Sequence, residues 1–186
     1  MVNGEKHRRS IRLAGYDYSQ AGLYFVTICA KDRMYMFGRV EHNTASPVGA
    51  GLCSALENDA YQMQLSAMGQ VIFDEWINLE KRFLNIHLHD FVIMPNHFHA
   101  IIELCDIDRA EHSPAPTVGD IICAFKSITI RRCNKENNMP GRMIWQRNYH
   151  EHIIRNAEAY HKIFEYIITN PLKWSDDCYH PMNLKV

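Results

Sequence analysis

Apolar positions follow strand-like or helical spacing along most of the chain. Residues 23–29 form a run of β-branched and aromatic side chains, which is typical of a buried strand, and a shorter strand is expected over 35–40. Apolar side chains then recur at helical spacing over 67–83. Because Ser66 precedes this run and its hydroxyl suits an N-cap, we predict an amphipathic helix that begins directly after it.

Two further strands and two further helices are expected in the second half of the chain. Residues 86–94 and 97–104 flank Pro95-Asn96, a pair typical of a tight turn, so they are predicted to form a hairpin. Helical spacing returns over 118–137 and again over 157–169. The last helix is expected to end just before a proline, which disfavours helical backbone in the residue preceding it.

The remaining segments complete the predicted organisation. An extended stretch over 149–155 gives the order strand, helix, hairpin, helix, strand, helix, which predicts an α+β sandwich with an antiparallel sheet. We expect one domain over 21–175 that contains a polar surface insertion at 41–60. A basic N-terminal arm, 1–20, and a C-terminal tail, 176–186, are expected to flank this domain.

The composition is that of an ordinary globular protein. The chain has 186 residues, of which 47% are apolar and 22% charged, and its formal net charge of −1 neither requires nor excludes a nucleic-acid partner. No apolar run reaches the roughly 18 residues of a membrane helix, and the first residues do not form a signal peptide. The six cysteines contain no CxxC pair, so we expect reduced thiols in a cytoplasmic protein.

The most informative chemistry lies just after the predicted turn, where two histidines flank one phenylalanine. Successive strand side chains point to opposite faces, so His97 and His99 share a face while Phe98 points into the core. Two neutral imidazoles in this arrangement can hold a divalent metal. A polar decoration of an exposed face is the competing interpretation. The same spacing recurs at His87 and His89 and at His150 and His152.

Strand pairing separates these histidines. A two-residue turn pairs Met94 with His97 and Val92 with His99. Asp90 then falls on the face of His97 and His99, where we predict that it orients one imidazole. The opposite face, which is apolar and expected to face the core, would carry His87, His89, Phe91, Ile93, Phe98, Ala100 and Ile102.

The last predicted helix offers a nucleophile and a further ligand. Tyr166 and Asn170 are four residues apart and therefore share a helix face. Tyrosine has a pKa of about 10, so it needs a metal that neutralises developing charge before it attacks phosphate readily. Asn170 offers an amide oxygen to the same metal. A packing role for Tyr166 and a helix-terminating role for Asn170 remain open on these residues alone.

Basic side chains gather in two places. The helix over 118–137 carries Lys126, Arg131 and Arg132 on its polar side, and the N-terminal arm over 1–20 carries several arginines close together. Each pattern is open to two interpretations. A solvated surface explains both patterns, and so does contact with phosphate groups of a nucleic acid.

Five segments of this sequence resemble the REP-associated tyrosine transposases, a branch of the single-tyrosine HUH transposases, in which two histidines flank an apolar residue. These segments follow one another in the family's order and span nearly the whole chain. They are Tyr24 to Thr27, Val92 to His99, Trp145 to Tyr149, Glu151 to Asn156, and Tyr166 to Pro171.

The resemblance implies a ferredoxin-like α+β sandwich with the HUH pair on a central strand. It also implies that Tyr166, on the C-terminal helix, is the catalytic tyrosine. In such proteins Mg²⁺ or Mn²⁺ is held by the two histidines and a polar residue one turn beyond the tyrosine, which here are His97, His99 and Asn170. The implied reaction cleaves single-stranded DNA near a hairpin through a 5′-phosphotyrosine and then rejoins strands.

The resemblance further implies a partner, and two alternatives stay open beside it. The partner is single-stranded DNA with a hairpin, and no membrane is involved. A monomer is expected in preference to a homodimer. The alternatives are a catalytically inactive protein that binds hairpin DNA or RNA and a small structural zinc protein, which the lack of clustered cysteines disfavours. The candidate DNA-binding residues are Arg8, Arg9, Arg12, Lys126, Arg131, Arg132 and Arg147.

Overall fold

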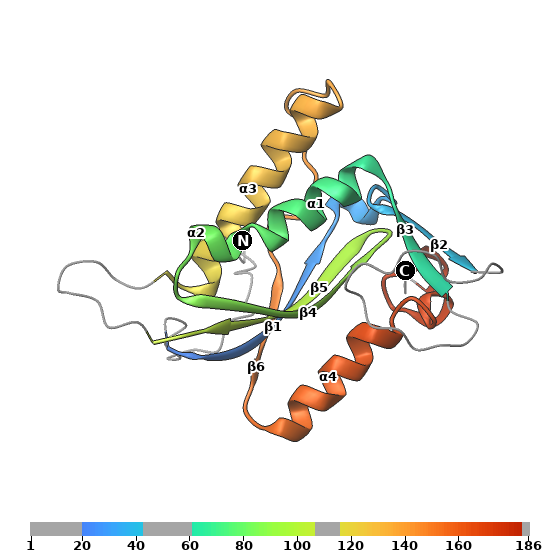
Figure 1. Ribbon diagram of the computed structural model, residues 1–186. Helices are drawn as coiled ribbons and strands as arrows, with labels where there is room; N and C mark the ends of the chain where they lie inside the picture. Colours follow the sequence, from blue (N-terminus) through green and yellow to red (C-terminus); the bar gives the residue numbers. More distant parts are fainter. Residues whose placement is uncertain (1–19, 43–60, 107–115, 184–186) are drawn as a thin grey trace, which may run out of the picture.

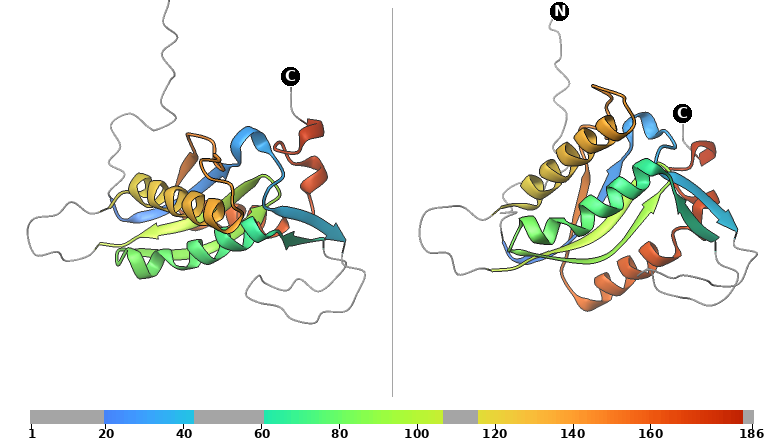
Figure 2. Two further views of the ribbon diagram at one scale, coloured as in Figure 1. Left: turned by 90° about the horizontal axis from the view of Figure 1, so that it is seen from above. Right: turned by 45° about the horizontal axis from the view of Figure 1, so that its top comes forward.

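The computed structural model describes residues 20–42, 61–106 and 116–183, and it shows an antiparallel sheet with helices on both faces (Figure 1). The sheet contains β1 (Gly22–Cys29), β4 (Ile86–Met94), β5 (His97–Leu104) and β6 (His150–Ile154) in the spatial order β4-β5-β1-β6. The helices are α1 (Ala67–Ile77), α2 (Leu79–Arg82), α3 (Val118–Glu136) and α4 (Ala157–Thr169). Helices α1 and α3 lie over one face of the sheet, and α4 lies across the other (Figures 1 and 2).

This topology confirms the predicted fold. Leaving aside the small sheet formed by β2 and β3, the chain runs β1-α1-β4-β5-α3-β6, and β1 lies between β5 and β6 with every neighbouring pair antiparallel. This is the ferredoxin-like arrangement, to which α4 is added on the second face. The predicted bounds of β4, β5 and α4 agree with the structure residue for residue.

Side-chain caps fix where the helices begin. The Ser66 hydroxyl accepts a hydrogen bond from the backbone N–H of Gly69 at 3.1 Å, as the sequence predicts for an N-cap. Thr117 and Asp120 form a reciprocal capping box at the start of α3. The predicted helix over 67–83 is interrupted at Asn78, and the short α2 that follows buries Leu79 in the core.

A small two-stranded sheet, β2 (Gly38–His42) paired with β3 (Tyr61–Leu65), extends beyond the main sheet. From the sequence, a strand is predicted near β2 but none at β3, although Tyr61, Met63 and Leu65 alternate with two glutamines, which is the spacing of a short strand. Gly38 has φ +144°, and a Cβ there would lie 2.1 Å from the carbonyl oxygen of Gln64, so only glycine fits. Most of the predicted insertion over 41–60 and nearly all of the arm over 1–20 lie outside the described residues.

Aromatic side chains fill the core between the sheet and the pair α1 and α3. The ring of Trp76 lies 4.7 Å from that of Phe98 and 5.2 Å from that of Phe125, centroid to centroid. The indole N–H of Trp145 donates to the hydroxyl of Thr129 at 2.8 Å, so this buried polar group is satisfied. A second apolar cluster on the opposite face holds α4 against the sheet through Met94, Ile101, Ile154 and Ile167.

A β-bulge in β4 corrects one part of the predicted pairing. Near the turn the register is as expected, with Met94 opposite His97 and Val92 opposite His99. Between Leu88 and Phe91, however, the register shifts, so His89 and Asp90 together oppose a single residue of β5. The prediction that His87 and His89 lie on the core face is therefore wrong. His87 is exposed. His89 contacts Glu103 of β5 and Tyr160 of α4.

Two properties of the described residues bear on the environment of the protein. None of the helices in this part of the chain combines the length and apolar character that crossing a membrane requires. Five of the six cysteines lie in the described ranges, and all five are free thiols. Cys29 and Cys133 are buried, and burial raises the pKa of each thiol to about 11, which makes both unreactive at neutral pH.

Candidate functional site

The first three residues of β5 place His97 and His99 side by side on the face of the sheet that α4 covers. Both side chains are buried, and their ring centroids lie 4.5 Å apart, while Phe98 points into the opposite core as predicted. Each imidazole contacts a neighbour through Nδ1. Nδ1 of His97 lies 2.9 Å from Oδ1 of Asn96, and Nδ1 of His99 lies 2.7 Å from the hydroxyl of Thr27 on β1. The Nε2 atoms of both rings are left to face the same space.

Helix α4 brings the predicted tyrosine and asparagine to these histidines. The hydroxyl of Tyr166 lies 3.2 Å from Nε2 of His99, across a long separation in the chain. Asn170, one turn further on, is 3% exposed. Hence four residues singled out in the sequence, namely His97, His99, Tyr166 and Asn170, meet on one face of the sheet.

An aspartate that the sequence did not indicate joins the group. Oδ2 of Asp177 lies 3.9 Å from Nε2 of His97, and ligand atoms of His97, His99 and Asp177 all lie within 4.8 Å of one another. Asp177 follows a 3-10 helix, Trp174–Asp176, in the stretch expected to begin a C-terminal tail. The only signal in the sequence was an acidic pair shortly after Asn170.

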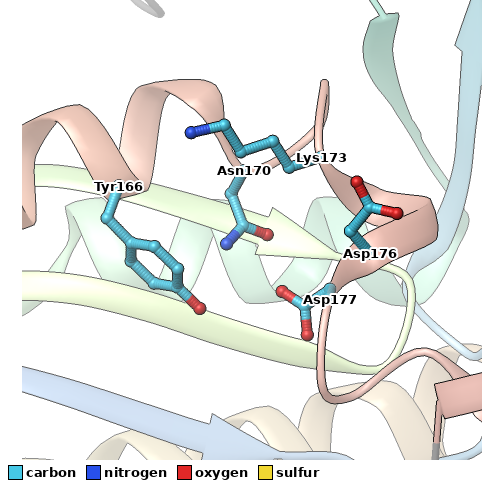
Figure 3. Close-up of a pocket in the computed structure, with 5 residues that line it drawn as sticks. All are labelled: Tyr166, Asn170, Lys173, Asp176 and Asp177. Carbon is cyan, nitrogen blue, oxygen red and sulfur yellow. The ribbon is translucent and has the colours of Figure 1, made fainter.

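A small cavity lies beside this group. Its volume is about 160 Å³. Figure 3 shows the phenol of Tyr166, the amide of Asn170 and the carboxylate of Asp177 directed toward a common space. The cavity is lined by Tyr166, Asn170, Lys173, Asp176 and Asp177. Lys173, which the sequence analysis did not single out, also lines this cavity, and its ammonium group is directed away from the phenol oxygen of Tyr166 (Figure 3).

The donor atoms fit a divalent cation. Nε2 of His97 and Oδ1 of Asn170 are buried and have no hydrogen-bond partner within the described parts of the chain. Buried polar atoms are rarely left without a partner, and a cation would satisfy both atoms at once. Two imidazole nitrogens, an amide oxygen and a carboxylate suit a metal such as Mn²⁺ or Mg²⁺.

Burial sets the protonation of the site. It lowers the pKa of His97 well below its usual value, with a further lowering from the neighbouring His99, and it lowers the pKa of His99 to about 3. Both imidazoles are therefore neutral at pH 7, which is the form that binds metals. Burial, followed by the charge of Asp177, raises the pKa of Tyr166 to about 12, so this phenol keeps its proton until a positive group assists its ionisation.

The C-terminal segment packs over the histidines. The ring of Tyr179 lies 4.6 Å from that of His97, and the ring of Trp174 lies 5.9 Å from it, measured between centroids. The carbonyl of Tyr179 accepts a hydrogen bond from the side chain of Asn96 at 2.8 Å. Residues beyond the predicted domain boundary at 175 thus form one wall of the site.

Among the described residues, Asp90 does not contact Nδ1 of either imidazole, as the orienting role predicted for it would require. The Nδ1 atoms of the two imidazoles, where an orienting carboxylate would bind, contact Thr27 and Asn96 instead. Asp90 lies at the bulge in β4, near Tyr160 of α4, where burial, followed by the charge of Asp90, raises the pKa of the Tyr160 phenol.

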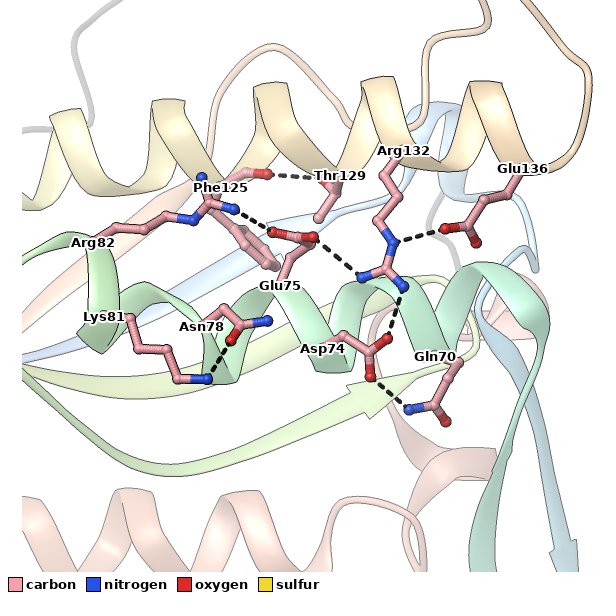
Figure 4. A network of polar contacts seen from close by, with 10 residues as sticks. All are labelled: Gln70, Asp74, Glu75, Asn78, Lys81, Arg82, Phe125, Thr129, Arg132 and Glu136. Carbon is pink, nitrogen blue, oxygen red and sulfur yellow. Dashed lines mark hydrogen bonds and ion pairs between the residues drawn. The ribbon is translucent and has the colours of Figure 1, made fainter.

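The predicted DNA-binding residues fall into separate groups. The ammonium group of Lys126 donates to the backbone carbonyls of Gln146 and Arg147 and so ties α3 to the segment before β6. Arg132 forms ion pairs with three carboxylates (Figure 4). Arg131 and Arg147 are exposed, and Arg8, Arg9 and Arg12 lie outside the described residues. Helix α3 lies over the face of the sheet opposite α4 (Figure 1).

Known proteins share this architecture. No protein-family model matches the chain. The fold is that of the REP-associated tyrosine transposases. A solved structure of one of them, bound to a REP hairpin, superimposes with a TM-score of 0.54 over 91% of this chain and 74% of that chain, at 19% sequence identity. Comparison of sequences shows the family to which the chain belongs. An uncharacterized protein of Haemophilus influenzae is 36% identical over 188 aligned residues, which cover 94% of this chain and 93% of that protein, and the chain belongs to the same family.

Proposed function

We propose that this protein is a transposase-like enzyme that cleaves single-stranded DNA near a hairpin and rejoins the strands. Tyr166 is the nucleophile in this proposal, and the intermediate is a 5′-phosphotyrosine. The observation that carries the proposal is the position of the Tyr166 hydroxyl, 3.2 Å from a buried histidine of the HUH pair, in a residue that lines a cavity of about 160 Å³. A packing role alone does not explain why the Tyr166 hydroxyl contacts a buried imidazole, or why Oδ1 of Asn170, at the same cavity, has no hydrogen-bond partner among the described residues.

The same residues support metal assistance. His97, His99 and Asn170 would hold Mg²⁺ or Mn²⁺, and Asp177 adds a carboxylate to the predicted ligand set. A divalent ion in this position polarises the scissile phosphate and neutralises the negative charge that develops on its oxygens. Tyr166 otherwise remains a weak nucleophile, because its pKa is about 12.

The covalent chemistry needs no other cofactor. The phenolic oxygen of Tyr166 forms a bond to phosphorus after losing its proton, and the bond from phosphorus to the 3′ oxygen breaks. The leaving 3′ oxygen takes up a proton to become a free hydroxyl. A 3′ hydroxyl of another strand reverses these steps and releases Tyr166, so strands are exchanged without an external energy source. Lys173 also lines the cavity and is a candidate contact for the phosphate.

The proposed partner is a DNA hairpin with unpaired bases beside it. The solved transposase of the same fold is bound to a REP hairpin, which supports this choice. Exposed Arg131 and Arg147 remain candidate phosphate contacts, together with the N-terminal arm. A monomer is proposed as the active form, since the histidines, Tyr166 and Asn170 all meet within one chain.

A covalent adduct tests the proposal directly. The purified protein is mixed with Mn²⁺ and a labelled hairpin oligonucleotide taken from the inverted repeats nearest its gene, and adducts are resolved on a denaturing gel. We expect an adduct with the wild-type protein and none with Tyr166→Phe. Tyr160→Phe is the matched control, because Tyr160 lies on the same helix and its hydroxyl contacts His89 rather than the HUH pair.

Each other result has a defined meaning. If the wild-type protein forms no adduct with any hairpin from its genomic neighbourhood, the proposed enzyme activity is wrong. If the adduct survives Tyr166→Phe, the activity stands but the nucleophile is another residue. Tight hairpin binding without an adduct and without metal uptake would support the alternative of an inactive hairpin-binding protein.

A further inference from the structure

Asn96, the second residue of the β4–β5 turn, is fully buried and uses every hydrogen-bonding group of its side chain. Its Nδ2 donates to the backbone carbonyl of Tyr179 at 2.8 Å and to that of Arg33 at 3.2 Å. Its Oδ1 lies 2.9 Å from Nδ1 of His97. The turn pattern alone gave Asn96 only a backbone role, whereas the structure shows three side-chain contacts to three separate segments.

These contacts determine which way the amide of Asn96 faces. A backbone carbonyl can only accept a hydrogen bond, so the atom that contacts Tyr179 and Arg33 must be the NH₂ group. The oxygen therefore faces His97. An amide oxygen can only accept, so Nδ1 of His97 must carry the proton and Nε2 must carry the lone pair. Nε2 is buried, has no hydrogen-bond partner in the described residues, and lies 3.9 Å from Asp177.

We infer that Asn96 is a positioning residue that holds His97 in its metal-binding tautomer and fixes the C-terminal segment that carries Asp177. The inference rests on the metal-binding role proposed for His97. Residues that hold the second nitrogen of a metal-bound histidine set both its tautomer and its ring orientation. Asn96 does so from a rigid turn, and the same amide reaches the chain two residues beyond Asp177.

The hydrogen bond from Asn96 to the carbonyl of Tyr179 also helps to orient the carboxylate of Asp177. The backbone N–H of Tyr179 donates to Oδ1 of Asp177 at 2.6 Å, which leaves Oδ2 directed at His97. Because Asn96 holds the carbonyl of Tyr179, it fixes the residue that in turn orients Asp177. His99 differs, since its Nδ1 contacts the hydroxyl of Thr27, which can rotate to donate or accept and so does not impose one tautomer.

The tautomer can be measured in the wild-type protein without DNA and without any substitution. Long-range ¹H–¹⁵N NMR spectra of the full chain, labelled on histidine nitrogen and kept free of metal, report which nitrogen of each imidazole is protonated. We expect the His97 ring at pH 7.5 to carry its proton on Nδ1 alone. A His97 ring with its proton on Nε2, or an equal mixture of both tautomers, would overturn the inference.

Substitutions then test the two contacts of Asn96, one with Nδ1 of His97 and the other with the carbonyl of Tyr179. Asn96→Ala removes the acceptor and both donors, so we expect mixed His97 tautomers and a fall in Mn²⁺ affinity of about 10- to 100-fold by titration calorimetry. Asn96→Asp keeps an acceptor facing Nδ1 and should retain the single tautomer. Asn85→Ala is the matched control, because Asn85 is also a buried asparagine and its Nδ2 donates to the carbonyl of Pro116, away from the histidines.

The results separate positioning from a general loss of structure. A purely structural asparagine would lower the melting temperature in Asn96→Ala and Asn85→Ala alike and leave the His97 tautomer unchanged, which would contradict the inference. Wild-type Mn²⁺ affinity in a folded Asn96→Ala protein would contradict it as well. The failure of DNA adduct formation in the wild-type protein would overturn the proposed function alone, since neither the tautomer nor the Mn²⁺ affinity depends on DNA.

Discussion

The hydroxyl of Tyr166 lies 3.2 Å from Nε2 of His99, the ring nitrogen that faces the proposed metal position. The other nitrogen of this ring is engaged by Thr27. One lone pair on Nε2 can accept the phenolic hydrogen or bind a cation, but it cannot do both. If His99 holds a metal through Nε2, the Tyr166 hydroxyl would have to leave this contact and would then be free to approach a phosphate group.

This competition leads to a prediction about Tyr166→Phe. The substitution removes a hydrogen bond that metal binding must break, and such a bond contributes about 0.5–1.5 kcal/mol. We expect Mn²⁺ to bind Tyr166→Phe about 2- to 10-fold more tightly than the wild-type protein in calorimetric titrations, with Tyr160→Phe unchanged. Weaker binding by Tyr166→Phe would show instead that the phenol itself is a ligand.

Asp177 is expected to contribute to metal affinity, whereas its neighbour Asp176 is not. Asp177 is buried and close to His97, whereas Asp176 belongs to the 3-10 helix at the rim of the cavity. Asp177→Asn removes the only carboxylate of the His97, His99 and Asp177 group, so we expect Mn²⁺ affinity to fall by roughly 10- to 100-fold, or about 1.4–2.7 kcal/mol. Equal effects of Asp177→Asn and Asp176→Asn would indicate a general electrostatic contribution and not direct ligation.

Thr27 is expected to support His99 through its hydroxyl. Thr27→Val preserves the shape of the side chain but leaves Nδ1 of His99 buried without a partner. Loss of such an orienting group lowers metal affinity about 10- to 100-fold in characterised sites. Thr27→Ser, which keeps the hydroxyl, should bind Mn²⁺ within a few-fold of the wild-type protein. If Thr27→Val binds as tightly as Thr27→Ser, the hydroxyl does not orient the imidazole.

Local patterns explain which parts of this site the sequence could predict. The β4–β5 hairpin and α4 follow from period-2 and period-3.6 spacing and from residues that begin or end each element, and these signals act over a few neighbours. They placed His97 and His99 on one face and Tyr166 with Asn170 on another element. The meeting of these two pairs was implied by the family resemblance and is now seen in the structure.

The sequence patterns did not predict the contacts between segments that lie far apart in the chain. Asp177 and Thr27 reach the histidines only because a tail folds back over β5 and because β1 pairs with it, and no local spacing encodes either event. The bulge that moved His87 and His89 off the core face is likewise a property of paired strands. The row of basic residues on α3 could not be interpreted from sequence for the same reason. Two of the three carboxylates that pair with Arg132 lie on α1, so the sequence of α3 alone does not show that Arg132 is engaged in ion pairs.

Acid should destabilise the metal-free protein through His99. Burial lowers the pKa of His99 to about 3, so the unfolded state binds a proton below its pKa of about 6.5 while the folded state does not. Stability from the neutral ring is therefore complete above pH 6.5 and is lost as pH falls toward 3. We expect the free energy of unfolding to decline in this window by up to about 1.4 kcal/mol per pH unit for this residue.

Urea denaturation without metal, at pH values from 7.5 to 4.5, isolates this contribution. His99→Gln should show a correspondingly shallower decline of the unfolding free energy than the wild-type protein. His161→Gln is the control, because His161 is exposed on α4. Parallel curves for the wild-type protein and His99→Gln would contradict a buried, neutral His99.

Two adjacent arginines on α3 should have opposite roles. Arg132 bridges α3 to α1 through Asp74 at 3.0 Å and Glu75 at 3.1 Å, and it also pairs with Glu136 on its own helix at 2.7 Å (Figure 4). Glu75 is buried, so after loss of Arg132 its carboxylate keeps only the ion pair with Arg82 among the residues that the structure describes. We expect Arg132→Gln to lower the free energy of unfolding by about 1–2 kcal/mol, measured by urea denaturation. Hairpin affinity and its salt dependence should be unchanged.

Arg131→Gln should show the reverse behaviour. Its side chain is exposed, so its loss should change stability by no more than about 0.5 kcal/mol. If Arg131 contacts a phosphate, hairpin affinity falls several-fold and the slope of log affinity against log salt becomes shallower by about 0.7–0.9, because one fewer counterion is released. Fluorescence anisotropy at several salt concentrations measures both quantities. Weaker hairpin binding by Arg132→Gln at unchanged stability would show that Arg132, despite its ion pairs, is the residue that contacts DNA.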